Sequence, residues 1–238
     1  MNVSGGENGA SQIVRWHSCA GAKGLQAEAV RRIRAAADSA ISARGLYRVV
    51  LSGGNTPRAI FSALRERPAN WPAWQVWFGD ERCLPPNDSE RNSRMARDTL
   101  LDHVPIPPQS ICVIPAERGA EDAAQAYAQS LRGVGDFDLV LLGLGEDGHT
   151  ASLFPGHDCG TAANSPDTLA VFEAPKPPSE RVSLSAARLS HARAVLFLVE
   201  GEAKRDAVSA WRRGDPIPAS TIAPATGVDV LVTADLLD

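Results

Sequence analysis

The sequence predicts an α/β fold in which a mainly parallel, twisted sheet carries helices on both faces. Short apolar runs alternate with longer amphipathic segments through most of the 238 residues. Several runs, such as YRVVL and FDLVLLG, are almost continuously apolar, which is typical of parallel strands buried on both faces. Polar or glycine-rich turns follow several of these runs directly. Repeated strand–helix–strand units therefore predict three layers, with the sheet in the middle.

In the first part of the chain the predicted strands and helices alternate without exception. Apolar runs with prominent Val, Ile, Leu and Phe predict strands over residues 13–17, 47–54, 74–82, 110–114 and 137–143. The segments between them place apolar residues three or four positions apart and predict helices over residues 22–43, 56–67, 91–104 and 121–132. Crossover helices return each strand to the same direction, so this alternation predicts a parallel sheet.

The order is looser after residue 160. Two short strands are expected over residues 169–175 and 181–189, and a third over 192–201. An amphipathic helix over 202–213 and a strand over 229–237 close the chain. We expect residues 12–238 to form one Rossmann-like domain and the polar, Gly/Ser-rich residues 1–11 to form a flexible tail.

Composition excludes several classes of function. The net charge of −4 and the pI of about 5.8 give no basic surface for nucleic acid or an anionic membrane. No apolar run approaches the roughly 18 residues of a membrane span, and the N-terminus lacks the pattern of a signal peptide, so a cytoplasmic protein is expected. The four cysteines form no C-x-x-C pair and are expected to be reduced thiols: Cys19, Cys83, Cys112 and Cys159.

The stretch LGLGEDGHTASLFPG contains the G-x-G-x-x-G spacing of dinucleotide-binding proteins at residues 143–148. That fingerprint requires a helix after its last glycine, and Pro155 with Gly156 stops any helix within two turns. We therefore expect no NAD cofactor. The turn instead carries Asp147 and His149, a carboxylate beside a group suited to proton transfer near neutrality. The alternative is a surface loop in which both side chains only cap backbone groups.

The turn SGGNTP follows the strand at 47–51 and opens a predicted helix. Thr56 suits the N-cap position and Pro57 the first turn. The glycines let backbone N–H groups face a common point, so the turn predicts a phosphate or carboxylate site at the helix N-terminus. The P-loop motif is absent, and a tight turn before a well-capped helix is the simpler alternative.

A third polar loop, FGDERCLPP, places Asp80, Glu81 and Arg82 at the end of the third predicted strand. Arg82 is a candidate cation for an anionic substrate or a developing oxyanion, although such runs are often solvated charge clusters. The carboxyl ends of parallel strands share one edge of the sheet, where ligands bind in such folds. The three loops therefore predict one site.

Other chemistries have weaker support in the sequence. There is no G-x-S-x-G motif for a serine hydrolase. Cys83 beside Arg82 is an activated thiol only if it is exposed, and a small buried cysteine is the simpler interpretation. A zinc site lacks the usual ligand spacing and would need four scattered residues: Asp147, His149, His157 and Cys159.

Five segments, taken in order, resemble one known family. They are LSGGNTPRAI, WFGDERCLPPNDSERNSRMARDTLLDHVPIP, FDLVLLGLGEDGHTASLFPGH, APKPPSERVSL and VLFLVEGEAKRDAV. The chain resembles the bacterial 6-phosphogluconolactonases of the pentose phosphate pathway. The resemblance implies a single α/β domain related to glucosamine-6-phosphate deaminase and ribose-5-phosphate isomerase. It also implies a sugar-phosphate lactone as substrate and no cofactor. Because the sequence offers no ligand cluster, we expect no metal, and we expect a monomer or weak homodimer.

The resemblance implies roles for particular residues. His149 would activate water, Asp147 would orient or stabilise it, and Arg82 would face the lactone carbonyl. The remaining expected site residues bind the substrate or its phosphate: Ser52, Gly53, Gly54, Asn55, Thr56, Asp80, Gly145, Arg181 and Lys204. Two positions depart from the family, with Asn55 where Ser is common and Ser93 where Tyr is common. The alternatives are a deaminase of this fold and a non-catalytic sugar-phosphate sensor.

Overall fold

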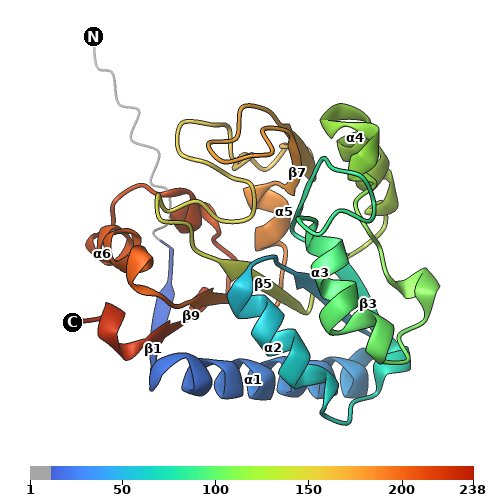
Figure 1. Ribbon diagram of the computed structural model, residues 1–238, viewed down its shortest axis with the longest axis horizontal. Helices are drawn as coiled ribbons and strands as arrows, with labels where there is room; N and C mark the ends of the chain where they lie inside the picture. The colour runs from blue at the N-terminus through green and yellow to red at the C-terminus, as the bar shows by residue number, and fades with distance from the viewer. Residues whose placement is uncertain (1–11) are drawn as a thin grey trace.

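A parallel sheet forms the centre of the protein (Figure 1). The computed structural model describes residues 12–238, so the tail predicted for residues 1–11 lies outside the described part. Within that part the sheet has six strands in the order β1-β9-β8-β5-β2-β3, each parallel to its neighbours. Their bounds are β1 Val14–Cys19, β2 Tyr47–Leu51, β3 Trp74–Phe78, β5 Leu139–Gly143, β8 Val195–Val199 and β9 Val228–Thr233.

Helices cover both faces of this sheet, as the sequence predicts. The chain moves from β1 to β2 and β3 towards one edge, through α1 (Gly21–Arg44) and α2 (Asn55–Arg65). It then moves back through β5, β8 and β9, passing α4 (Ala120–Ser130), α5 (Ala186–Ser190) and α6 (Arg205–Arg213). Because such crossovers are right-handed, the reversal of direction places these two groups of helices on opposite faces.

Side-chain contacts agree with this assignment. Tyr127 of α4 packs against Trp77 of β3, and Trp211 of α6 packs against Phe197 of β8 and Trp16 of β1. The strand register places Trp77, Phe197 and Trp16 on the same face. On the other face α1 contacts α2, and α2 contacts α3 (Asn92–Thr99). The buried apolar side chains form a continuous cluster from Cys19 to Leu236.

A second, smaller sheet lies beside the first and corrects one prediction. Its strands are β4 (Asp80–Arg82), β7 (Arg181–Leu184) and β6 (Thr168–Val171), all antiparallel, with β7 in the middle. The single strand predicted for residues 74–82 is therefore wrong. Gly79 interrupts it: its N–H donates to the Leu51 carbonyl, while its own carbonyl accepts from the Leu184 N–H. Asp80–Arg82 are thus strand residues of the second sheet rather than a loop.

Three other predictions differ from the structure at proline-rich or capped positions. Residues 110–114 form no strand, because prolines flank them and only an isolated bridge joins Ile111 to Val76. The predicted strand 181–189 is β7 followed by α5, since the Ser185 hydroxyl accepts from the Arg188 N–H and caps a new helix. The helix predicted for 91–104 ends as an α-helix at Thr99. The four cysteines are free, and no helix in the described part is long and apolar enough to cross a membrane.

An ionic cluster joins the edge strand β1 to β9. Arg15 donates two hydrogen bonds, of 3.2 and 2.7 Å, to the Asp229 carboxylate, and His17 lies 2.5 Å from the same group. Partial burial raises the pKa of Asp229, but the hydrogen bonds from Arg15 and His17 outweigh it and lower the pKa to about 2. The ionised carboxylate therefore stabilises the folded chain.

We predict that Asp229→Asn lowers the free energy of unfolding by about 1–2 kcal/mol at pH 7, allowing for solvent screening. A depressed folded pKa contributes stability above the unfolded pKa of about 4, and this contribution disappears as the pH falls towards 2. Urea unfolding of both proteins between pH 7 and pH 2 measures the difference. A gap that stays constant over this range would show that charge is not its cause.

Candidate active site

A cavity of about 730 Å³ opens at the carboxyl edge of the parallel sheet. It lies where the chain reverses its winding between β2 and β5, which is where ligands bind in doubly wound sheets. Eleven residues predicted for the site line it: Ser52, Gly53, Gly54, Asn55, Thr56, Asp80, Arg82, Gly145, His149, Arg181 and Lys204. The twelfth, Asp147, lies behind His149 and is hydrogen-bonded to it. The structure thus brings all three predicted loops together.

The loop between β2 and α2 presents unpaired donors to this cavity. The helix begins at Asn55 with Gly54 as its N-cap, so the N-cap predicted at Thr56 is wrong by two residues. No side chain caps the helix, and the first intrahelical bond runs from the Arg58 N–H to the Gly54 carbonyl. The preceding N–H groups, together with the helix dipole, favour an anion here. The Ser52 hydroxyl is buried in the same wall and has no hydrogen-bond partner in the described part of the chain.

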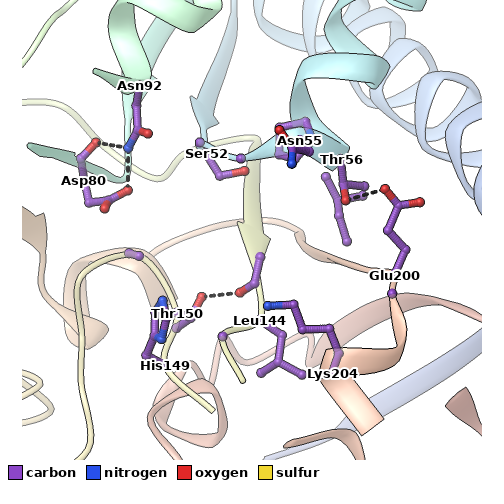
Figure 2. A pocket seen from close by; sticks show the side chains of 18 of the residues that line it. Ser52, Asn55, Thr56, Asp80, Asn92, Leu144, His149, Thr150, Glu200 and Lys204 are labelled. Carbon is purple, nitrogen blue, oxygen red and sulfur yellow. Dashed lines mark hydrogen bonds between the residues drawn. The ribbon is translucent and has the colours of Figure 1, made fainter. Parts of the chain in front are cut away.

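Gly53 is required because the buried Asn92 lies against it. A β-carbon at position 53 would collide with the Asn92 amide. That amide donates two 3.0 Å hydrogen bonds to Asp80, one to the backbone carbonyl and one to the carboxylate. The other carboxylate oxygen of Asp80 accepts a 2.7 Å bond from the Ser152 hydroxyl. Asp80 therefore joins its own strand to the segments of Asn92 and Ser152; Figure 2 shows its bonds to Asn92. Asn92 was missed from the sequence, which offers no signal that it meets Gly53.

The loop after β5 answers the question raised by its glycine spacing. No helix follows Gly148; the chain continues in turns to Gly160 and beyond. The prediction that this is not a dinucleotide-binding turn is consistent with that geometry. Gly145 has a different purpose, because a β-carbon there would overlap the His149 ring. The Gly145 N–H also donates a 2.7 Å bond to the His149 carbonyl, which closes the loop.

His149 and Asp147 form a hydrogen-bonded pair. The Nδ1 atom of His149 lies 2.5 Å from Oδ1 of Asp147, which also accepts a 3.1 Å bond from the His149 N–H. Partial burial raises the pKa of Asp147, but these bonds outweigh it and leave the pKa below its ordinary value. An ionised Asp147 keeps the proton on Nδ1, so Nε2 of a neutral ring is free to accept one. The Phe154 ring, 4.8 Å away, supports the imidazole.

Two arginines face each other in the small sheet. Arg82 of β4 is the register partner of Arg181 of β7. Like charges in this position are unfavourable. Burial lowers the pKa of Arg181, the Asp80 charge raises it, and the Arg82 charge lowers it further. The Arg82 Nε atom is buried and has no hydrogen-bond partner among residues 12–238. This arrangement favours a bound anion or a developing negative charge beside both guanidinium groups.

Lys204 lies in a different electrostatic setting from Arg181. It comes from the short helical turn after β8 and is half-buried. Burial lowers its pKa, while the charge of Glu146 raises it. Glu200 directly follows β8. It also lines the cavity and accepts a 2.6 Å hydrogen bond from the Thr56 hydroxyl. The sequence analysis did not identify Glu200, because its importance arises from a contact with Thr56, which is far away in the sequence.

The surroundings of two residues beside the site, Glu81 and Cys83, indicate structural rather than catalytic roles. Glu81 is fully buried and accepts hydrogen bonds from the Asn92 and Ser93 N–H groups, so its carboxylate serves the N-terminus of α3. Burial, followed by the charge of Glu180, raises the pKa of Cys83 to about 11, so its thiol is protonated near neutrality, which favours the simpler interpretation of this cysteine. Within residues 12–238 no three His, Cys, Asp or Glu side chains are arranged to hold a metal, so the scattered zinc ligands considered above are not assembled.

Known proteins match this chain over nearly its whole length. The family model described as glucosamine-6-phosphate isomerases/6-phosphogluconolactonase matches residues 20–231. A 6-phosphogluconolactonase of Mycobacterium leprae (strain TN) is 35% identical over 230 residues, covering 91% of this chain and 92% of the relative. A solved 6-phosphogluconolactonase from Trypanosoma brucei has a TM-score of 0.85 at 27% identity, and the match covers 95% of this chain and 98% of the other. A monomeric glucosamine-6-phosphate deaminase, with a TM-score of 0.80 at 20% identity, shares the fold.

We predict that Gly145→Ala displaces the His149 ring and weakens its bond to Asp147, because the added carbon overlaps the imidazole. Gly143→Ala is the matched control, since a β-carbon there meets nothing within 4 Å. Nitrogen NMR of the histidine rings should show a changed Nδ1 signal for His149 in the first variant only. An unchanged signal in Gly145→Ala would contradict this account of the glycine.

Proposed function

The chain belongs to the glucosamine-6-phosphate isomerase/6-phosphogluconolactonase family, and from this premise we propose how its site works. The protein is an enzyme that hydrolyses 6-phospho-D-glucono-1,5-lactone to 6-phosphogluconate in the pentose phosphate pathway. The observation that carries the mechanism is the Asp147–His149 pair in a cavity with unpaired donors at the α2 N-terminus. The likeness to the deaminase concerns the fold alone and supports no second activity.

His149 acts as the general base in this proposal. Its Nε2 atom removes a proton from a water molecule, whose oxygen attacks C1 of the lactone. Asp147 holds the ring in the required tautomer and stabilises the imidazolium that forms. The resulting tetrahedral intermediate carries its negative charge on the former carbonyl oxygen. No covalent bond to the protein is needed.

Collapse of the intermediate reverses the proton transfer. The bond between C1 and the ring oxygen breaks, and the imidazolium of His149 returns its proton to that oxygen. The product is an open chain with a carboxylic acid, which ionises in water. We propose that neither a metal nor an organic cofactor takes part, because His149 supplies the base and arginine the stabilising charge.

Arg82 and Arg181 stabilise the oxyanion. They are register partners, so they approach the same part of a bound substrate. A preorganised cation at a developing oxyanion is worth roughly 3–4 kcal/mol in the transition state. This assignment moves Arg181 away from the phosphate, where the sequence analysis expected it, because the charges acting on Arg181 are Asp80 and Arg82 rather than those acting on Lys204.

In this proposal the phosphate binds at the wall of the cavity opposite Arg82 and Arg181. The N–H groups at the start of α2, the Ser52 hydroxyl and Lys204 supply donors and positive charge there. Two or three charge-assisted bonds, partly offset by desolvation, leave a net preference of about 3–4 kcal/mol. That is on the order of 10²–10³ in kcat/KM for the 6-phosphorylated lactone over plain gluconolactone. The cytoplasmic location and the monomeric or weakly dimeric state stay predictions.

We predict that His149→Gln lowers kcat by roughly 10²–10⁴, the usual contribution of general acid–base catalysis. Asp147→Asn should cost less than this, because the base is retained but poorly oriented. A pH-stat assay of freshly prepared lactone, corrected for spontaneous hydrolysis, measures both. His157→Gln is the matched control, since this exposed histidine does not line the cavity. Normal turnover in folded His149→Gln would exclude it as the base.

We predict that the three cations separate by substrate. Arg82→Met and Arg181→Met should lower kcat for phosphorylated and plain gluconolactone by the same factor, about 10²–10³, because both lactones form the oxyanion. Lys204→Met should lower kcat/KM for the phosphorylated lactone only. Arg58→Met, an exposed position of α2 outside the cavity lining, is the control. If Arg181→Met instead removed only the preference for phosphate, Arg181 would belong to the phosphate wall.

A further inference from the structure

Glu200 places a carboxylate at the wall of the cavity that otherwise offers donors and positive charge. Figure 2 shows its side chain reaching Thr56 at the start of α2, with Lys204 below it. The 2.6 Å hydrogen bond from the Thr56 hydroxyl is the one bond to its carboxylate in the described part of the chain. This hydroxyl is available because Gly54, and not Thr56, is the N-cap of the helix.

No ion pair neutralises this carboxylate among residues 12–238, although nearby acids have partners. Glu202 pairs with Arg205, and Glu146 with Lys176. The other charged groups that line the same cavity come from the small sheet, the β5 loop, the turn after β8 and the end of β9: Asp80, Arg82, Arg181, His149, Lys204 and Asp235. Asp80 is already engaged by Asn92 and Ser152. Within residues 12–238 the Glu200 carboxylate thus lies at the α2 N-terminus without an ion-pair partner.

We infer that Glu200 is a specificity-determining residue that weakens the binding of phosphate at this wall. The inference rests on the proposed function, which places the 6-phosphate beside Thr56. A phosphate oxygen that accepts from the first N–H groups of α2 lies close to Glu200, and the two negative charges repel each other. Glu200 also accepts the hydrogen bond that the Thr56 hydroxyl donates, so this donor is not available to the phosphate.

This repulsion has a use in a hydrolase whose substrate and product share the phosphate. Contacts to an unchanged group are equally strong in substrate, transition state and product, so they lower KM without raising kcat. They also slow the release of product. A carboxylate at the phosphate wall offsets part of this uniform binding, while the contacts at the reacting carbonyl are left intact. Glu200 therefore favours turnover over tight retention of 6-phosphogluconate.

The test compares Glu200→Gln with wild type. The variant keeps the shape and an acceptor for Thr56 but removes the charge. We expect KM for the phosphorylated lactone and Kd for 6-phosphogluconate, measured by calorimetry, to fall about tenfold. The KM for plain gluconolactone should change less than twofold. Glu202→Gln removes a charge two residues away, outside the cavity lining, and should change neither ligand's affinity. Glu200→Ser provides a second uncharged side chain.

The outcomes separate this inference from the proposed function. If the wild type prefers the phosphorylated lactone and Glu200→Gln binds phosphorylated ligands no more tightly, the inference is wrong and the proposed function stands. Weaker binding in both Glu200 variants would assign the residue to holding the ligand, which also overturns the inference. If the wild type shows equal kcat/KM for both lactones, the phosphate does not bind at this wall, and both the proposed phosphate site and the inference about Glu200 are wrong. An equal gain in Glu202→Gln would reduce the effect to overall charge.

Discussion

The reversal of winding between β2 and β5 is the constraint on which the rest of the structure depends. These strands are hydrogen-bonded neighbours, but the chain leaves β2 towards one edge of the sheet and β5 towards the other. Because crossovers are right-handed, the segments that follow diverge to opposite faces and cannot fill the space above the strand ends. The cavity is a consequence of topology. Its chemistry depends on which residues occupy the two diverging loops.

The small sheet turns this space into a defined site. Gly79 redirects the chain out of β3, and the next residues pair with β7 and not with the main sheet. This brings buried charge to the cavity wall, which is tolerated only when it is paired or hydrogen-bonded. Glu81 satisfies that condition at the N-terminus of α3, and Asp80 satisfies it through Asn92 and Ser152. Arg181 donates to the Pro178 and Lys176 carbonyls, and Arg82 donates to the Glu90 carbonyl. Neither arginine has a carboxylate partner in residues 12–238, and their like charges lie opposite each other, which supports the role proposed for them beside an oxyanion.

Much of the fold and most of the site follow from the sequence, and the exceptions have physical causes. Apolar periodicity marks the parallel strands because they are buried on both faces. The break at Gly79 was missed because a short strand in a second sheet has the same local pattern as a continuation of the first. Asn92 and Glu200 were missed because their importance arises from contacts to Gly53 and Thr56, far away in the sequence. Such pairings exist only in the folded chain.

The two glycine-rich loops, after β2 and after β5, differ in whether a helix follows, and this difference suits them to different groups. The β2 loop opens directly into α2, so its N–H groups and the helix dipole suit a permanent anion such as phosphate. The β5 loop has the spacing of an anion-binding turn, but no helix follows it, and an anion would gain no dipole there. Its glycine instead makes room for the ring of His149, held by Asp147. A group that must gain and lose a proton is better placed away from a fixed positive potential, which would oppose its protonation. The absence of a helix after this loop is thus compatible with the acid–base role proposed for His149, and the glycine spacing here makes room for an imidazole ring instead of opening a helix.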